Sequence, residues 1–237
     1  MKLLLVLALF SSGCFAASAP VRSYYVLEAI PGSPPVAPPM QGLLRVRNLD
    51  AASAYDKFQI VVRKSPYELR YSQSDVWAVK PNRMLSDVIA QALADAGTFT
   101  SVSRELGETR PSFTLDGDLH ALEVYDSDDL WFAHLSFSLR LTDFNDGQVL
   151  WHFSFDERKQ VHSRTFSHAA RVMSELLSTA LERAMTSLTR MSRRGTSAPE
   201  ERQPPGIDEA PPPPGAPPEE EIPDPIYVPE TPSPEPQ

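Results

Sequence analysis

Few residues of this chain are of types that do chemistry, and none of them stands in a recognisable catalytic pattern. The 237 residues include one cysteine, Cys14, and five histidines. A single cysteine excludes an internal disulfide and a cysteine-rich zinc site. The spacings typical of serine hydrolases, zinc proteases and nucleotide-binding loops are missing from the sequence. The sequence therefore favours a protein that is not an enzyme and that holds no cofactor.

Two groups of polar residues allow metal binding as an alternative. His120 and His134 lie on the polar faces of two adjacent predicted strands, where they could be cross-strand neighbours. His152 lies too far along the chain to supply a third ligand, so we predict no metal site and interpret these residues as surface histidines. The acidic run "DSDD" at 126–129 lacks the glycine and the distal glutamate of a calcium-binding loop, and we interpret it as a solvated turn.

Cys14 follows a short apolar segment. Lys2 precedes eight apolar residues, 3–10, and three small residues, 11–13, separate them from Cys14. Eight residues are too few to cross a bilayer, which takes about 20. A positive start, an apolar stretch and a small-residue end are typical of an export signal. The position of Cys14 after the small residues raises the question of what its thiol is for.

The end of this segment resembles a lipobox, the processing site of bacterial lipoproteins. The resemblance implies that 1–13 is a signal peptide, that Cys14 is acylated, and that 14–22 is a tether. Several acyl chains on one residue make a lasting anchor, because each buried methylene contributes about 0.8 kcal/mol. By resemblance to enteric lipoproteins, the lack of aspartate after Cys14 favours the periplasmic face of the outer membrane. The alternative is a secretory signal with an incidental cysteine.

Alternating apolar and polar residues predict an antiparallel meander in the second half of the chain. Odd-numbered positions are apolar from 131 to 141 and again from 149 to 155, with the turn signal Asp146-Gly147 between them. A strand over 113–126 would pair with 131–143 through the acidic turn. One face of this meander should contact the core and the other should face water.

Two stripes of apolar residues with helical spacing predict helices packed on this sheet. The first helix spans 82–96, and Gly97 suits the left-handed position just past its end. The second runs from Ser167, its expected N-cap, to about residue 191. Shorter strand-like runs precede the first helix. We therefore predict an α/β domain at 23–194, with a mixed β-sheet flanked by helices.

The segment 195–237 differs in composition from the rest of the chain. It holds 15 of the 24 prolines, and from Thr196 onward it carries ten acidic residues and one basic residue, a balance of 1 − 10 = −9 that equals the net charge of the chain. The rest of the chain is neutral on balance, so nothing indicates nucleic-acid binding. We predict a disordered tail. Its one apolar island, around Tyr227, could bind a partner, and a solvating spacer is the alternative.

Amphipathic aromatic residues in the segment 55–102 are candidates for contact with a partner. Tyr67, Tyr71 and Trp77 lie between two predicted strands and the first helix. Tyrosine and tryptophan are enriched at protein interfaces, but they also fill cores. For Trp77 we favour a place in the core over a partner contact.

The spacing of aromatic and apolar residues carries a second resemblance. It includes a strand–turn–strand at 141–151, and its other positions are 24–27, Tyr55, Asp56, Arg63, 65–69, Trp77, Pro81, Leu85, Leu93, Phe99 and Val102. Over about 14–190 this pattern resembles the ABC-type transport auxiliary lipoproteins, the PqiC-like family. The resemblance rests on apolar and aromatic spacing, not on a catalytic signature.

This resemblance implies a fold similar to the N-terminal domain of TolB and a non-enzymatic role. It implies an auxiliary lipoprotein in a lipid transport system, in which an ABC transporter and MCE-domain proteins move lipids between the inner and outer membranes. The implied partners are the MCE-domain protein and its ABC transporter, and a homo-oligomer is allowed. An envelope tether that uses the proline-rich tail is the alternative function, and a hydrolase with an unrecognised site is a third.

The acylation of Cys14 is directly testable. Radiolabelled palmitate should enter the wild-type protein in cells and should not enter Cys14→Ala, because the thiol is the acyl acceptor. Autoradiography of the purified proteins measures the label. Equal labelling of the two proteins, or no labelling of either, would contradict the lipoprotein interpretation.

Overall fold

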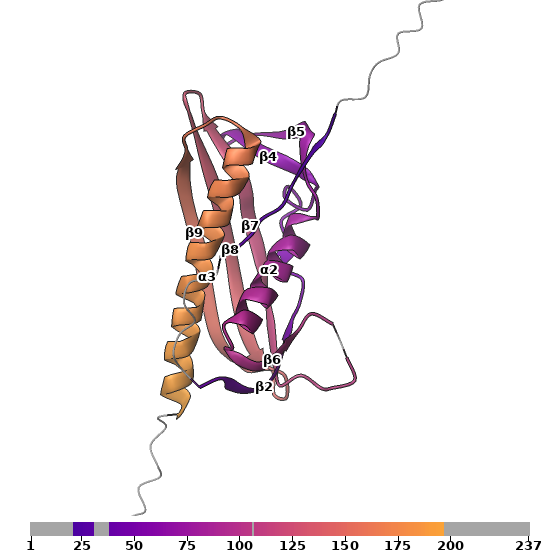
Figure 1. The fold of residues 1–237 in the computed structure, drawn as a ribbon, viewed down its shortest axis with the longest axis vertical. Coiled ribbons are helices and arrows are strands. Elements are labelled where there is room, and N and C mark those ends of the chain that lie inside the picture. The colour runs from indigo at the N-terminus through magenta and orange to yellow at the C-terminus, as the bar shows by residue number, and fades with distance from the viewer. Residues whose placement is uncertain (1–20, 31–37, 106, 197–237) are drawn as a thin grey trace, which may run out of the picture. The chain divides into compact units, whose positions relative to one another are not determined.

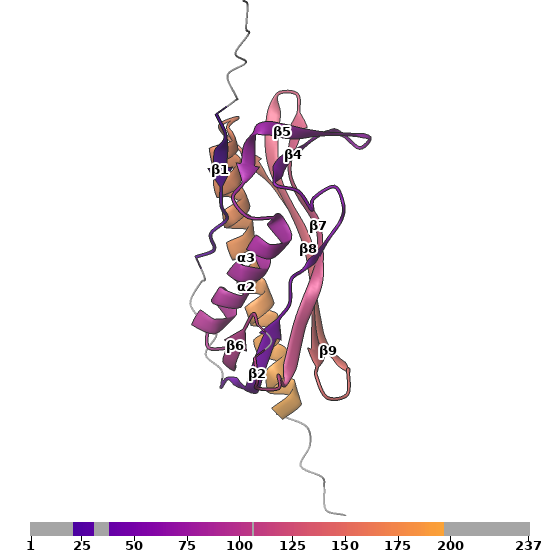
Figure 2. The same ribbon diagram turned by 90° about the vertical axis from the view of Figure 1, so that its right-hand side faces the viewer.

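The computed structural model describes residues 21–30, 38–105 and 107–196 (Figure 1). Cys14, Tyr227 and the predicted tail from residue 197 onward lie outside the described residues. The described domain is a mixed β-sheet with two helices on one of its faces, as Figures 1 and 2 show from two directions. This confirms the predicted fold class, with both helices on the same face.

The three longest strands form the predicted meander. They are β7 (Phe113–Ser127), β8 (Leu130–Asp143) and β9 (Val149–Val161), and both pairings are antiparallel. Phe137 of β8 lies opposite Leu119 of β7 and Phe155 of β9, and all three are buried. Gly147 in the β8–β9 turn has φ of +73°, which glycine adopts without strain.

The other edge of β7 is shared by three strands that follow one another along it. All three run parallel to β7: first β2, then β3, then β4. β5 pairs with β4 in the antiparallel sense, while β6 and β1 pair in parallel with β2 and β5. Their bounds are β1 (Ser23–Tyr25), β2 (Met40–Val46), β3 (Asp50–Ala51), β4 (Gln59–Ser65), β5 (Glu68–Trp77) and β6 (Phe99–Ser103).

The helices are α2 (Pro81–Asp95) and α3 (Phe166–Thr196). Proline at the first position suits the start of α2, because its missing N–H would have no helical partner there. Gly97 follows α2 with φ of +60°, as predicted. Within the described residues, neither helix is both long and apolar enough to cross a membrane.

The predicted start and end of α3 were both wrong. The helix begins one residue before Ser167, and the backbone N–H of His168 donates to Thr165 Oγ1 at 3.4 Å, so Thr165 takes the capping role. The helix continues to Thr196, beyond the predicted end near 191. Arginine and methionine favour helices, and they extend α3 past the last buried position of its apolar stripe.

The core lies between the sheet and the two helices. The odd-numbered residues of β8 from Ala133 to Leu141 face it, together with the apolar stripe of α3. Trp77 is 1% exposed and belongs to this core, so its side chain is not on the surface as a partner contact requires. Burial thus supports the core interpretation of Trp77.

The acidic turn between β7 and β8 is less solvated than predicted. Asp126 is buried, and it accepts hydrogen bonds from Lys64 Nζ at 2.6 Å and from Arg164 Nη2 at 3.3 Å. Two basic side chains therefore occupy this carboxylate. The ion pairs connect the turn to β4 and to the residues just before α3.

Candidate functional site

A polar cleft of about 460 Å³ opens on the sheet face that neither α2 nor α3 covers, which we name the helix-free face. Figure 2 shows this face on the side away from α2 and α3, with the β4–β5 turn projecting from it. Pro66 of that turn forms part of the wall. The polar side chains in the lining are Tyr55, Arg63, His120, Glu123, Tyr125, His134, Ser136, Asp156 and Arg158.

An irregularity in β7 decides which residues face the cleft. The pairing register between β7 and β8 shifts between Leu119 and Ala121, which leaves His120 as a bulge. Before the bulge, Leu115 and Leu119 face the core, whereas after it the even-numbered residues do. The bulge therefore turns Glu123 to the helix-free face.

Glu123 is the centre of a buried hydrogen-bond network. Tyr55 Oη donates to Glu123 Oε2 at 2.6 Å, and Arg63 Nε donates to Glu123 Oε1 at 2.7 Å. Arg63 Nη2 also donates to Tyr55 Oη at 2.9 Å, which closes a ring of three side chains. Tyr55 comes from the loop before β4, so this network attaches the loop to the sheet.

His134 connects Glu123 to the edge strand β9. Its Nδ1 lies 3.0 Å from Glu123 Oε1, and its Nε2 lies 3.0 Å from Asp156 Oδ1. Ionised carboxylates only accept hydrogen bonds, so His134 can only donate in these contacts, through whichever of its ring nitrogens carries a proton.

The network shifts the pKa values of Glu123, Tyr55 and Asp156. Burial alone would raise the pKa of Glu123, but hydrogen bonds from His134, Arg63 and Tyr55 outweigh it and lower the pKa to about 2. Burial and, to a smaller extent, the hydrogen bond to Glu123 raise the pKa of Tyr55 to about 12. The hydrogen bond from His134 lowers the pKa of Asp156. Neither Glu123 nor Tyr55 is poised to exchange a proton near neutral pH.

Ser136 lines the cleft beside His134, but these two residues do not form a nucleophile–base pair. A general base needs a free ring nitrogen, and both nitrogens of His134 face carboxylates.

The two histidines singled out in the sequence are not paired across the strands. The residue opposite His134 is Glu123, and His120 Nε2 instead lies 3.1 Å from Ser138 Oγ. The bulge at His120 breaks the register on which the metal alternative depended. Among the described residues, no cluster of three or more His, Cys, Asp or Glu side chains has a geometry suited to a metal ion.

Two of the predicted partner-binding residues lie on the surface near this cleft. Tyr67 is 98% exposed beside the β4–β5 turn. Tyr71 lies opposite Val61 of β4, which in turn pairs with Glu123, and Lys57 Nζ sits 4.5 Å from the centre of the Tyr71 ring. The structure thus brings the Tyr71 side of β5 to the same face as the charge network.

Sequence reasoning missed the network of Glu123, His134 and Asp156. One signal was present: apolar residues of β7 occupy odd positions through Leu119 and even positions from Leu122, and this change of parity indicates a bulge. A bulge would have moved Glu123 to the polar face. The contributions of Tyr55 and Arg63 depend on tertiary contacts.

The comparisons with known proteins agree with this architecture. The sequence profile described as "ABC-type transport auxiliary lipoprotein component" matches residues 25–184. No curated protein matches the chain. Protein XCC0632 from Xanthomonas campestris has a similar structure, with a TM-score of 0.66 and 21% identity over 74% of this chain and 99% of that one. A second solved structure, of an uncharacterized protein, has a TM-score of 0.53 and 16% identity over 72% of this chain and 97% of that one.

The fold and the cleft define a class of protein: an α/β domain with helices on one sheet face and a charge-paired polar cleft on the other. The two solved structures, at 21% and 16% identity, support the fold alone. The sequence profile covers more than half of the chain. The chain therefore belongs to the family of ABC-type transport auxiliary lipoproteins.

The charge network makes a prediction about stability and pH. The pKa of Glu123 falls from 4.5 to about 2 on folding, so the ionised group stabilises the folded state above about pH 4.5. This contribution is lost as the pH falls toward 2. Glu123→Gln should lower the free energy of unfolding by about 3 kcal/mol at pH 7, and its deficit relative to wild type should shrink below pH 4.5.

Urea denaturation of both proteins between pH 3 and pH 7 measures this difference. Glu182→Gln, which removes an exposed carboxylate from α3, is the control for the loss of one negative charge. A Glu123→Gln deficit that is the same at every pH would contradict the assigned role of the ionised carboxylate.

Proposed function

We propose that this protein is a non-enzymatic auxiliary component of an ABC and MCE-type lipid transport system. In this proposal, acylated Cys14 anchors it at the periplasmic face of the outer membrane, and an MCE-domain protein of the system binds to it. The observation that carries the proposal is membership of the transport auxiliary lipoprotein family over residues 25–184. The lipid transport role, the MCE partner and the outer membrane are the parts that go beyond this membership.

The helix-free face supports a docking role because its charged groups are fixed. Glu123 is held by three side chains, so the face presents one defined arrangement to a partner without the cost of ordering it on binding. Arg158 lies over the ring of Tyr125 at 5.0 Å, which adds a second ordered cation to the cleft. Preorganised aromatic and arginine side chains are typical of interface hot spots.

Tyr67 and Tyr71 extend this face beyond the cleft. Both belong to the region of the β4–β5 hairpin, and both have exposed rings. Large amphipathic rings of this kind contribute contact area at low entropic cost. We propose that the MCE-domain protein contacts these rings and the adjacent cleft. Tyr227 remains a proposed second contact, outside the described residues.

Tyr71→Ala tests this interface, and Phe144→Ala is its matched control. Both aromatic side chains are 38% exposed, but Phe144 lies in the β8–β9 turn, away from the proposed interface. Tyr71→Ala should weaken binding to the purified MCE-domain protein encoded with the transporter by at least about tenfold, as loss of a hot-spot aromatic does. Phe144→Ala should bind as wild type does.

Surface plasmon resonance measures the affinities, and circular dichroism verifies that both variants are folded. Wild-type affinity in folded Tyr71→Ala would remove Tyr71 from the interface. Failure of the wild-type protein itself to bind would contradict the proposed partner.

A further inference from the structure

The N-terminal segment carries an unusual set of exposed apolar side chains. Four of the large exposed hydrophobic residues of the described chain fall within 21–30, and together we name them the apolar ridge: Val21, Tyr24, Val26 and Ile30. A strand with one side on the core and the other in water normally alternates apolar residues inward with polar residues outward. Here the residues between them, Tyr25, Leu27 and Ala29, already pack against the core. The ridge therefore exposes apolar side chains that the fold itself does not use, with the exposed carboxylate of Glu28 between Val26 and Ile30.

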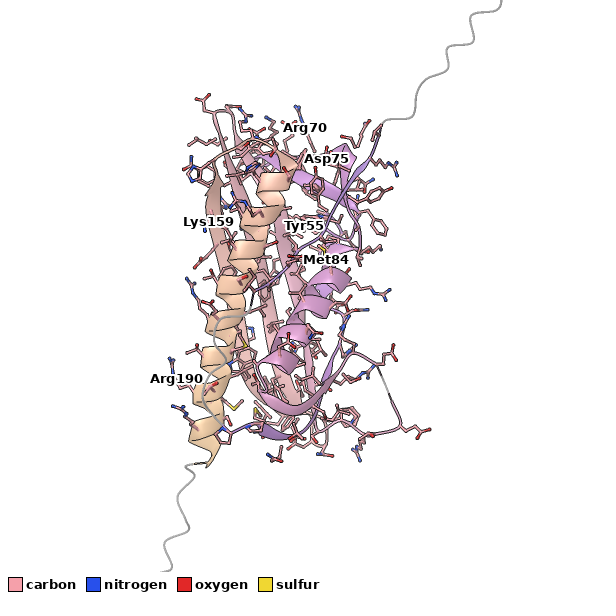
Figure 3. The ribbon with its side chains drawn as sticks, in the orientation of Figure 1. Tyr55, Arg70, Asp75, Met84, Lys159 and Arg190 are labelled. Atoms are coloured by element: carbon pink, nitrogen blue, oxygen red, sulfur yellow. The ribbon has the colours of Figure 1, made fainter. Side chains whose placement is uncertain are left out.

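The backbone beneath the ridge is fixed in place. Backbone N–H groups of Leu27, Glu28 and Ile30 donate to Met84 Sδ at 3.3 Å, Ser174 Oγ at 3.2 Å and Ser178 Oγ at 3.2 Å, respectively. The segment thus lies along the outer side of the helices, as Figure 2 shows, and Figure 3 labels Met84 on α2 beneath it.

Further contacts fix the strand at the start of the ridge. Tyr25 Oη donates to Asp75 Oδ1 at 2.9 Å, and the backbone N–H of Ala78 donates to the Tyr25 carbonyl at 2.8 Å. Because the backbone is held at intervals, the apolar side chains project outward on a defined frame. Their exposure is a property of the folded domain and not of a loose terminus.

The position of the ridge in the chain indicates what covers it. Val21 is seven residues from Cys14. Seven residues span at most about 25 Å even when fully extended. An acyl anchor on Cys14 therefore keeps Val21, the first residue of the ridge, within that distance of a bilayer surface. Arg22, next to Val21 and exposed, supplies a cation for lipid phosphates.

We propose that the apolar ridge rests on the bilayer that holds the acyl anchor, with its side chains in the lipid headgroup region. Tyr24, Val26 and Ile30 alternate with the inward-facing Tyr25, Leu27 and Ala29, and exposed apolar and aromatic side chains of this kind are what a membrane interface accepts. This inference rests on the acylation of Cys14, which belongs to the proposed function. The inference specifies which side of the domain faces the lipid. In this orientation the helix-free face stays open to a protein partner.

The far end of α3 lies away from the start of the ridge. Figure 3 labels Arg70 and Arg190 at opposite ends of the domain, and the chain enters near the Arg70 end. The 31 residues of α3 extend for about 46 Å. In the proposed orientation, α3 ends at the side of the domain that is farthest from the start of the ridge.

Single-cysteine variants test the contact, because acylation consumes the one native thiol. Val26→Cys places a probe on the ridge, and Val149→Cys is the matched control, since both valines are 53% exposed. The full-length acylated proteins are labelled with a thiol-reactive fluorophore and reconstituted in vesicles of phosphatidylethanolamine and phosphatidylglycerol. Iodide in the buffer and nitroxide-labelled lipids in the bilayer then serve as quenchers.

We expect the probe at residue 26 to be quenched by the nitroxide lipid and to be shielded from iodide at least about threefold more than the probe at residue 149. Equal iodide quenching at the two positions, in protein that floats with the vesicles, would overturn the ridge contact and leave the anchor intact. Failure of the protein to float with the vesicles would overturn the anchor, and the ridge proposal with it.

A second copy of the chain is the competing occupant. The Val26→Cys probe is therefore also measured in a Cys14→Ala background without vesicles, where the proposal expects free access of iodide. Shielding of the probe in this soluble protein would show that a protein surface covers the ridge, and it would overturn the bilayer proposal.

Discussion

The helix-free face of this protein depends on a carboxylate that is buried against it. Glu123 is 1% exposed as a side chain, and an unpaired charge in such a place would strongly destabilise the fold. Tyr55, Arg63 and His134 supply the compensating hydrogen bonds. Each comes from a different part of the chain, so the carboxylate can be buried only when all three parts are in place.

This constraint explains how an irregular segment becomes part of a rigid surface. The segment 52–58 has few backbone hydrogen bonds to the sheet, and Tyr55 links it to Glu123 at 2.6 Å. Arg63 forms the same link for the C-terminal half of β4, beside the hairpin that carries Tyr67 and Tyr71. The hydrogen bonds that compensate the buried charge of Glu123 therefore also order the face that we propose binds a partner.

The two sides of the domain differ in the tasks that we propose for them. Helices and the N-terminal segment cover one face of the sheet, and the apolar ridge lies on its outer side, toward the proposed anchor. Neither described helix covers the opposite face, which is polar and ordered by ion pairs. If the protein is lipid-anchored and also binds a transport component, it needs two such surfaces, because a surface that is occupied by lipid cannot bind a protein.

The sequence predicted the parts of the fold that repeat a simple period. Apolar residues occupy the odd positions of β8 from 131 to 141 and of β9 from 149 to 155, so the buried faces of Phe137, Trp151 and Phe155 followed directly. The stripe of α3 was equally regular, but it did not fix the start of the helix, because Thr165 and Ser167 are both acceptable caps.

The site was harder to predict because it depends on a break in that period. The bulge at His120 turns Glu123 outward, and a reading that assumes uniform alternation over β7 misses it. Tyr55, Arg63 and Asp156 then meet Glu123 and His134 from segments far apart in sequence. Of the residues at this face, Tyr67 and Tyr71 were singled out from the sequence as candidates for partner contact, but their place beside the network was not predicted.

Hydrogen–deuterium exchange of wild type and Glu123→Gln tests most directly whether this carboxylate orders the face. If it does, exchange at pH 7 will rise in 52–58 and in β4, while β8, β9 and α3 keep their wild-type protection. Unchanged exchange in 52–58, or an equal rise throughout the domain, would contradict the claim that Glu123 orders the helix-free face.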